Sequence, residues 1–575
     1  MFEKSKIVLV GILFLGLFFR LYGNNWDQGW HLHPDERFLT MVGVDVKIPS
    51  SIEEYLNPST SSFNPVNKGH SFYVYGTFPV LLNKLFAQYL YNDTYDLFNL
   101  QGRVLSGIAD FFVIIIIYKL IELVEKKLKF PYSIKYFSAF FYAIAVLPIQ
   151  LSHFFAVDTF LNFFCWLSLY YAIKTVIQKK KTLLFNVCMS GVFFGLALAC
   201  KISAIYVAPL IGVFILLGMY RVILVKTGIQ SKIFNLNKDI RGWIPACAGI
   251  TIFLFSCYFA LRLGSPYYFE TNTVFNPQLS SVFVNNLQTL KSFENPQALF
   301  PPAIQWLSKS FDFPIKNVIF FGVGVCYFLL SLIGLFSLLK KRNIFVTICI
   351  LWVGLFFTSQ SIQFAKTMRY LIFFYPFLAM FAAVGMVFII DKTKKISKKF
   401  SYFSFVICLL SVLIWPVAFM SIYTKDHSRV TASRWIYNTI PSGSTILTEY
   451  WDDALPLTVE NSASKEYNRV EVHIFDPDTK EKWLTINNQL KNANYYIMSS
   501  NRGWGSIMEV PEKYPLSSQF YRNMFANKQG YILVSKFVSY PSLRYLGIPL
   551  DFPDQWAEEA FTVYDHPEIM IFKKS

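Results

Sequence analysis

Residues 7–38 read IVLVGILFLGLFFRLYGNNWDQGWHLHPDERF, an apolar run followed by a cluster of ionisable side chains. The run Ile7–Tyr22 approaches the roughly 20 residues that a helix needs to cross a bilayer. If the N-terminus is cytoplasmic, the cluster Trp30–Phe38 lies at the outer membrane surface. The adjacent carboxylates Asp35 and Glu36 then have two interpretations. They take part in chemistry at the lipid–water interface, or they cap a helix that has Pro34 near its first turn.

The composition is typical of a polytopic membrane protein. Of the 575 residues, 54% are hydrophobic and 18% are aromatic, whereas only 15% are charged. The formal net charge of +17 is compatible with nucleic-acid binding. However, the basic residues gather in short runs between apolar segments, as signals of membrane topology do. We therefore expect membrane lipids, and no nucleic acid, among the partners.

Apolar runs long enough to span a bilayer recur along the first three quarters of the chain. They predict a polytopic α-helical membrane protein with about eleven transmembrane helices. The runs are 7–22, 102–121, 135–152, 159–177, 183–199, 203–224, 243–262, 317–339, 344–359, 370–390 and 402–423.

Clusters of Lys and Arg lie before the first run and after every second one, so all of them fall on one side if the helices alternate in direction. The positive-inside rule makes that side cytoplasmic. The sequence therefore predicts an integral, multi-pass protein with a cytoplasmic N-terminus and an extracytoplasmic C-terminal part. The clusters lie within 4–6, 126–129, 179–181, 221–241, 340–342 and 392–399.

The predicted outer side carries two long aromatic loops, 23–101 and 263–316, and isolated ionisable residues at helix ends. After residue 424 the composition becomes polar and no further run could span a membrane. Strand signals at 445–448, 495–498, 531–536 and 568–572 alternate with helix signals at 429–439 and 516–527, which predicts a small extracytoplasmic α/β domain. We therefore expect a membrane domain over 1–424 and a soluble domain over 425–575.

Several ionisable residues on the outer side are candidates for chemistry. Asp35 or Glu36 could act as a general base toward a hydroxyl acceptor, because a carboxylate at a partly dry interface can be tuned for that role. Asp158 begins the fourth predicted helix and is either catalytic or an N-cap. His33 and His153 could join the carboxylates in a site for one divalent metal ion.

Two cations at outer helix ends, Lys201 and Arg369, could hold a lipid phosphate together with Tyr370. Arg369 could engage a phosphate through two parallel hydrogen bonds. The alternative is that both cations anchor their helices at the membrane interface by extending toward the headgroups.

The ordered motifs HPDER (33–37), HFFAVD (153–158), GLALACK (195–201) and RYL (369–371) resemble those of the GT-C membrane glycosyltransferases. The resemblance is to the dolichyl-phosphate-mannose protein mannosyltransferases and the bacterial aminoarabinose transferases of lipid A. It covers residues 1–424. Through residues 435–443 and the motif DHP (565–567), the C-terminal domain resembles that of uncharacterised bacterial members, which implies a bacterial or archaeal cell membrane.

This resemblance implies a glycosyltransferase that moves a sugar from a polyprenyl-phosphate-linked donor to a glycan, lipid or protein acceptor on the outer face. Asp35 would deprotonate the acceptor hydroxyl, which would attack the anomeric carbon in one inverting displacement. Lys201, Arg369 or a metal ion would stabilise the leaving lipid phosphate.

Two other functions remain open at the level of sequence. A transporter or flippase for a lipid-linked or amphipathic solute would usually show internal repeats and polar residues near the membrane midplane. A non-catalytic assembly protein would use its C-terminal domain to bind a partner. The absence of a visible repeat and the outer placement of the polar residues favour the enzyme.

Overall fold

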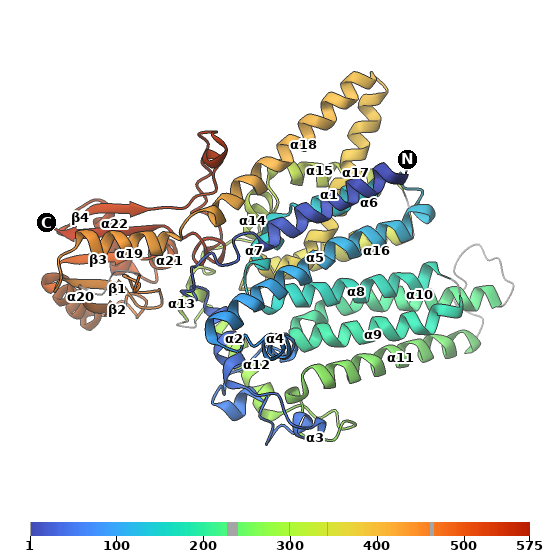
Figure 1. Ribbon diagram of the computed structural model, residues 1–575, viewed down its shortest axis with the longest axis horizontal. Helices are drawn as coiled ribbons and strands as arrows, with labels where there is room; N and C mark the ends of the chain where they lie inside the picture. Colours follow the sequence, from blue (N-terminus) through green and yellow to red (C-terminus); the bar gives the residue numbers. More distant parts are fainter. Residues whose placement is uncertain (1, 179, 227–239, 298–299, 342, 460–464) are drawn as a thin grey trace.

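The computed structural model describes residues 2–178, 180–226, 240–297, 300–341, 343–459 and 465–575. Long helices form one bundle, and a small sheet with its own helices lies beyond one end of that bundle (Figure 1). The N-terminus and the turn between α17 and α18 lie at the end of the bundle that faces away from the sheet.

Each predicted apolar run coincides with a long helix or with a pair of shorter ones. The helices of the bundle are α1 (Phe2–Leu21), α5 (Tyr95–Leu128), α6 (Ile134–Ala143), α7 (Val146–Ser152), α8 (Val157–Ile177), α9 (Leu183–Cys200), α10 (Ala208–Lys226), α11 (Ile240–Gly264), α14 (Phe313–Asn317), α15 (Val325–Leu339), α16 (Ile344–Ile362), α17 (Tyr375–Lys394) and α18 (Lys398–Met420).

By length and composition, seven helices of the described chain could cross a membrane, or nine if each of two bent pairs is one span. The bends are 54° between α6 and α7 and 114° just before α15. Gly324 lies in the second bend with φ +86°, a conformation that glycine adopts without steric cost. The predicted polytopic helical fold is confirmed, with seven to nine candidate spans where the sequence predicted about eleven. The two remaining runs form α1 and α11, and the apolar part of α11 that is described, Ala248–Gly264, is short.

The loops on the predicted outer side fold into short helices that cover the ends of the long ones. These are α2 (Pro34–Asp45), α3 (Ile52–Leu56), α4 (Phe78–Tyr89), α12 (Ser281–Phe293) and α13 (Pro301–Ile304), with 3-10 turns η3 (Ile202–Val207), η6 (Met368–Phe374) and η7 (Ser421–Thr424).

The C-terminal part forms a mixed five-stranded sheet in the order β2-β1-β3-β5-β4, in which β1–β3 are parallel and β4 and β5 are antiparallel. The predicted α/β region is confirmed. Strand β2 and helix α20 were missed, because β2 (NRVEV) is a polar edge strand and α20 has few apolar residues. The elements are α19 (Ser428–Thr439), β1 (Thr445–Glu449), β2 (Asn468–Val472), α20 (Lys480–Asn492), β3 (Tyr495–Met498), α21 (Arg502–Ile507), α22 (Pro515–Phe525), β4 (Tyr531–Phe537), α23 (Glu559–Thr562) and β5 (Ile569–Lys574).

The end of the chain returns to the helical bundle just before β5. The carboxylate of Asp565 accepts hydrogen bonds from Gln150 on α7 and from Tyr423, both at 3.0 Å. His566 lies buried between Asp565 and Asp554, with ring nitrogens 2.5 and 2.9 Å from their oxygens. Burial alone would lower the pKa of His566, but the two carboxylates raise it to about 10. The imidazolium is therefore charged at neutral pH and joins Asp554 to Asp565, and Asp565 in turn bonds Gln150 and Tyr423 of the bundle.

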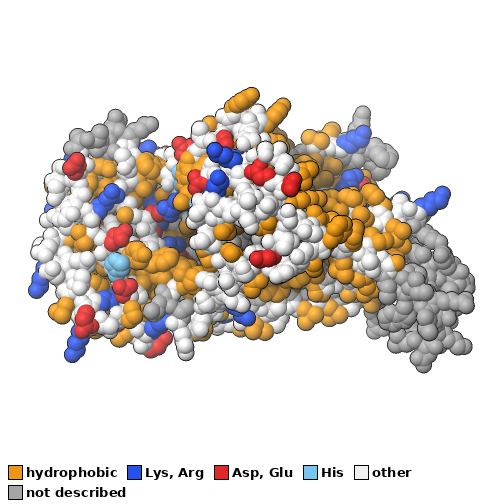
Figure 2. Space-filling view, turned by 90° about the horizontal axis from the view of Figure 1, so that it is seen from below, with side chains coloured by type: hydrophobic (Ala, Val, Ile, Leu, Met, Phe, Trp, Pro, Cys, Tyr) orange, Lys and Arg blue, Asp and Glu red, His pale blue; other side chains and the backbone are white. Residues whose placement is uncertain are grey.

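The surface differs between the two parts of the molecule. Figure 2 shows charged side chains scattered over the sheet region, whereas apolar side chains gather over the helical part. That distribution is expected for helices that face lipid and for a sheet region that faces water.

Candidate active site

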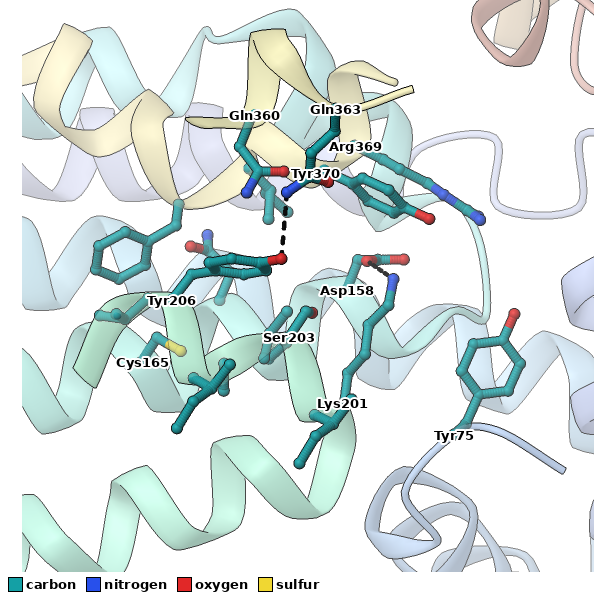
Figure 3. A pocket seen from close by; sticks show the side chains of 18 of the residues that line it. Tyr75, Asp158, Cys165, Lys201, Ser203, Tyr206, Gln360, Gln363, Arg369 and Tyr370 are labelled. Carbon is teal, nitrogen blue, oxygen red and sulfur yellow. Dashed lines mark hydrogen bonds and ion pairs between the residues drawn. The ribbon is translucent and has the colours of Figure 1, made fainter. Parts of the chain in front are cut away.

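Two cavities meet where the helix ends nearest the sheet region approach the C-terminal part. The helix cavity, of about 270 Å³, lies among α8, η3, α16 and η6, and Figure 3 shows its polar residues. The loop cavity, of about 400 Å³, lies among the N-terminus of α2, the loop before α4, the segment 290–306 and the segment 558–564. The residues that line both cavities, and so form their common wall, are Val74, Tyr75, Leu290, Glu294, Arg369 and Tyr370.

Asp35 and Arg369 form an ion pair at this common wall. Pro34 and Asp35 begin α2, and the ring nitrogen Nδ1 of His33 accepts a hydrogen bond from the backbone N–H of Glu36 as the N-cap. From there Asp35 accepts a hydrogen bond of 2.5 Å from Nη1 of Arg369, with the Asp35 side chain 26% exposed. Burial raises the pKa of Asp35, but the charges of Arg369 and His33 outweigh it and lower the pKa to about 2. In this state Asp35 is ionised but weakly basic.

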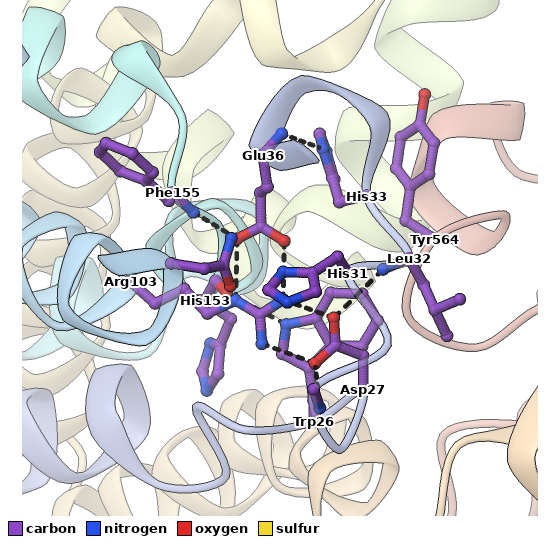
Figure 4. Close-up of polar contacts among 12 residues, drawn as sticks. Trp26, Asp27, His31, Leu32, His33, Glu36, Arg103, His153, Phe155 and Tyr564 are labelled. Atoms are coloured by element: carbon purple, nitrogen blue, oxygen red, sulfur yellow. Dashed lines mark hydrogen bonds and ion pairs between the residues drawn. The ribbon is translucent and has the colours of Figure 1, made fainter. Parts of the chain in front are cut away.

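Glu36 points away from Asp35, since adjacent helical residues differ by about 100° in direction. Its carboxylate is fully buried and accepts bonds from Arg103 at 2.7 and 2.8 Å and from the N–H of Phe155 at 2.5 Å (Figure 4). Arg103 also bonds both oxygens of Asp27 and lies over the ring of Trp26. Arg37, the next residue along the chain, pairs with Asp453 instead.

We expect Arg103→Met to destabilise the protein by about 3–5 kcal/mol, because it leaves two buried carboxylates without their cation. Thermal unfolding in detergent would show this as a clear fall in Tm. Lys119→Met is a matched control on the same helix, since Lys119 pairs with Glu122 in an exposed position. Equal Tm values for the two variants would show that the buried triad does not stabilise the fold.

Asp158 and Lys201 form a second ion pair, 2.8 Å long, inside the helix cavity (Figure 3). Asp158 stands in the first turn of α8, and Lys201 follows the last residue of α9. The ring of Tyr370 lies 5.0 Å from Nζ of Lys201 and 5.8 Å from the guanidinium carbon of Arg369. The two cations and Tyr370 therefore form one group that links both cavities.

The two histidines do not fit the predicted metal site well. Both ring nitrogens of His153 lie within hydrogen-bond distance of backbone carbonyls, those of Ile149 and Tyr22, and its ring stacks on Tyr423. His33 uses Nδ1 in the cap of α2 and packs against Tyr564. No group of three metal-ligating side chains occurs in the described part of the chain.

Four residues of the site region were missed by the sequence analysis: Asp27, Tyr75, Arg103 and Glu558. Arg103 offered a signal, because a cation inside an apolar run usually has a partner. The other three gave none. Tyr75 reaches the common wall because Gly76 lies directly against the backbone of Ala199, where a Cβ atom would be only 1.7 Å from the carbonyl oxygen.

The family described as "Dolichyl-phosphate-mannose-protein mannosyltransferase" matches residues 88–234. No curated protein sequence matches the chain.

Solved structures resemble the whole fold at low sequence identity. The archaeal oligosaccharyltransferase AglB from Archaeoglobus fulgidus, in complex with an inhibitory peptide and a dolichol-phosphate, is 12% identical with a TM-score of 0.52, covering 100% of this chain and 89% of AglB. The same oligosaccharyltransferase in complex with Zn and sulfate is 13% identical (TM-score 0.49; 96% of this chain, 73% of that one). ArnT from Cupriavidus metallidurans bound to undecaprenyl phosphate is 12% identical (TM-score 0.37; 99% and 98%).

The likeness to AglB is one of fold. The segment 88–234 matches the family of dolichyl-phosphate-mannose-protein mannosyltransferases, and the whole chain resembles AglB in fold.

Proposed function

We propose that the protein transfers a sugar from a polyprenyl-phosphate donor to an acceptor hydroxyl on the outer face of the membrane, with inversion of the anomeric configuration. The proposal rests on the common wall, that is, on the residues that line both cavities. Arg369 and Tyr370 line both cavities, Lys201 lines only the helix cavity, and Asp35 lines only the loop cavity. A phosphate on one side of this wall would bring its sugar to a carboxylate on the other.

The donor would occupy the helix cavity. Its walls are mostly apolar, with Leu161, Phe356 and Phe373 among them, which suits a prenyl chain that enters from the bilayer. Lys201 and Arg369 would bind the phosphate through charge-assisted hydrogen bonds. The dolichol-phosphate held by AglB, a protein of the same fold, is compatible with this arrangement.

Donor binding would also activate the base. The phosphate competes with Asp35 for Arg369, and loss of that ion pair would raise the pKa of Asp35 from about 2 toward a useful value. Asp35 then takes the proton of the acceptor hydroxyl, and the hydroxyl oxygen forms a bond to the anomeric carbon. The bond from that carbon to the phosphate oxygen breaks with its electron pair, and Lys201 and Arg369 stabilise the negative charge that develops.

The same proposal includes the topology. The basic loops would be cytoplasmic, and residues 425–575 would form an extracytoplasmic domain beside a membrane domain over 1–424. In Figure 1 the N-terminus and the sheet lie at opposite ends of the bundle, which supports this orientation. The acceptor is a hydroxyl compound of glycan, lipid or protein origin.

Proteoliposomes containing a radiolabelled polyprenyl-phosphate hexose would test the function. We expect the label to leave the lipid and to appear on added hydroxyl acceptors, with free polyprenyl phosphate as the second product. A transporter or flippase would instead move the label across the bilayer while it stays attached to the lipid. That result would overturn the proposal. NMR of the new anomeric centre would decide between inversion and retention.

A further inference from the structure

Glu558 brings a carboxylate of the C-terminal part into the loop cavity. It is the N-cap residue of α23, is 2% exposed, and lines the cavity together with Asp35 and Arg369. Its Oε2 accepts a hydrogen bond of 2.6 Å from the N–H of Met368, and its own N–H bonds Asn317 at 2.8 Å. Its second oxygen, Oε1, is buried and has no hydrogen-bond partner in the described part of the chain.

A buried oxygen without a partner is costly. Several occur in the described chain, and Glu558 Oε1 is the one that belongs to a residue lining the loop cavity. Burial raises the pKa of Glu558 to about 7, although the Met368 N–H, the Thr367 hydroxyl and Arg369 favour its charged form. The hydrogen bond that Oε2 accepts from Met368 fixes the backbone beside Arg369. Oε1 makes no such bond and remains available to a ligand.

The rest of the loop cavity indicates which ligand. Its other carboxyl groups are those of Asp35 and Glu294. In the ionised form a carboxylate only accepts hydrogen bonds, so a ligand that pairs with ionised Glu558 and Asp35 donates them. The acidic groups outnumber the one arginine, which is already paired, and this disfavours an anionic ligand. Aromatic walls and a volume of about 400 Å³ suit a compact ring rather than an extended chain. The aromatic residues include Phe38, Tyr75, Phe300, Trp306, Tyr370 and Tyr564.

We infer that Glu558 binds the acceptor through Oε1, and that the reacting end of this acceptor is an uncharged saccharide whose hydroxyls donate to Glu558 and Asp35. The inference depends on the proposed function and adds its acceptor class. It also gives the C-terminal part a role in the site, since Glu558 lies 190 residues from Met368 along the chain.

The test uses the full-length protein with a labelled polyprenyl-phosphate hexose and three acceptors: an alkyl glycoside, a Ser/Thr-containing peptide and a phosphorylated glycolipid. We expect transfer to the alkyl glycoside at a higher kcat/KM than to the other two. Glu558→Gln should raise the KM for the glycoside about 10- to 100-fold, as expected for a hydrogen bond to a charged group. Donor Kd should change less than twofold, because the amide oxygen of Gln can still accept from Met368.

Two further variants separate binding from support of the loop. Glu558→Ala loses both oxygens and should weaken donor binding as well, since Met368 adjoins Arg369. Glu568→Gln is a matched control, because Glu568 is a buried glutamate of the same region that pairs with Lys536 outside the cavity. It should leave both the KM for the glycoside and the donor Kd unchanged.

Three outcomes overturn the inference: an unchanged KM for the glycoside in Glu558→Gln, preferred transfer to the peptide, or preferred transfer to the phosphorylated glycolipid. In each of these cases the proposed function still holds, because the label has been transferred. If the wild-type protein releases no label to any acceptor or to water, the proposed function itself fails, and the inference fails with it.

Discussion

Asp35→Asn is expected to lower the turnover of sugar transfer by about 10²- to 10⁴-fold, the usual cost of losing a well-placed general base. The asparagine keeps the size of the side chain but cannot accept a proton. The same change should leave donor binding as tight as in the wild type, or tighter, because Asp35 no longer competes with the phosphate for Arg369. Single-turnover transfer assays and equilibrium donor binding would measure the two effects separately.

Glu36→Gln provides the comparison for Asp35→Asn. Glu36 lies beside Asp35 in the sequence but is fully buried against Arg103, so its loss should affect stability more than turnover. Near-normal turnover of Asp35→Asn would place the base elsewhere, with Asp158 as the next candidate. The segment HPDER would then be a helix cap and an ion pair without a catalytic role.

Arg369→Lys should weaken donor binding and lower turnover, although the charge is preserved, because lysine lacks the planar fork that bonds a phosphate through two donors. For Arg369→Leu we expect a fall in kcat of about 10²- to 10³-fold, comparable to the loss of one donor that stabilises a developing anion. Lys201→Ala should act in the same direction. Titration with polyprenyl phosphate, which carries no sugar to transfer, would measure binding separately from the chemical step.

The alternative for these cations is that they anchor helices at the membrane surface. Anchors would tolerate Arg369→Lys, so intact donor affinity and turnover in both Arg369→Lys and Lys201→Ala would favour that interpretation. A double-variant cycle sharpens the test. If Asp35 and Arg369 act on each other, the effects of Asp35→Asn and Arg369→Leu on donor binding will not be additive.

The sequence alone determined the helical membrane architecture, because apolar runs and basic loops are local patterns that each helix carries in itself. It also predicted most of the C-terminal strands, which are short and apolar. Strand β2 was not predicted, because a polar edge strand does not show an apolar run. The order of the motifs in the sequence indicated Asp35, Asp158, Lys201 and Arg369 as candidate site residues.

Only the tertiary structure decided which of these residues meet. Asp35 pairs with Arg369 across 334 residues, and Glu36 turns to Arg103, which no local spacing encodes. Glu558 gave no signal at all, since a glutamate in a polar segment looks like any surface residue until the fold buries it. The physical reason is that secondary structure follows from neighbours along the chain, whereas pairing and burial depend on contacts between distant segments.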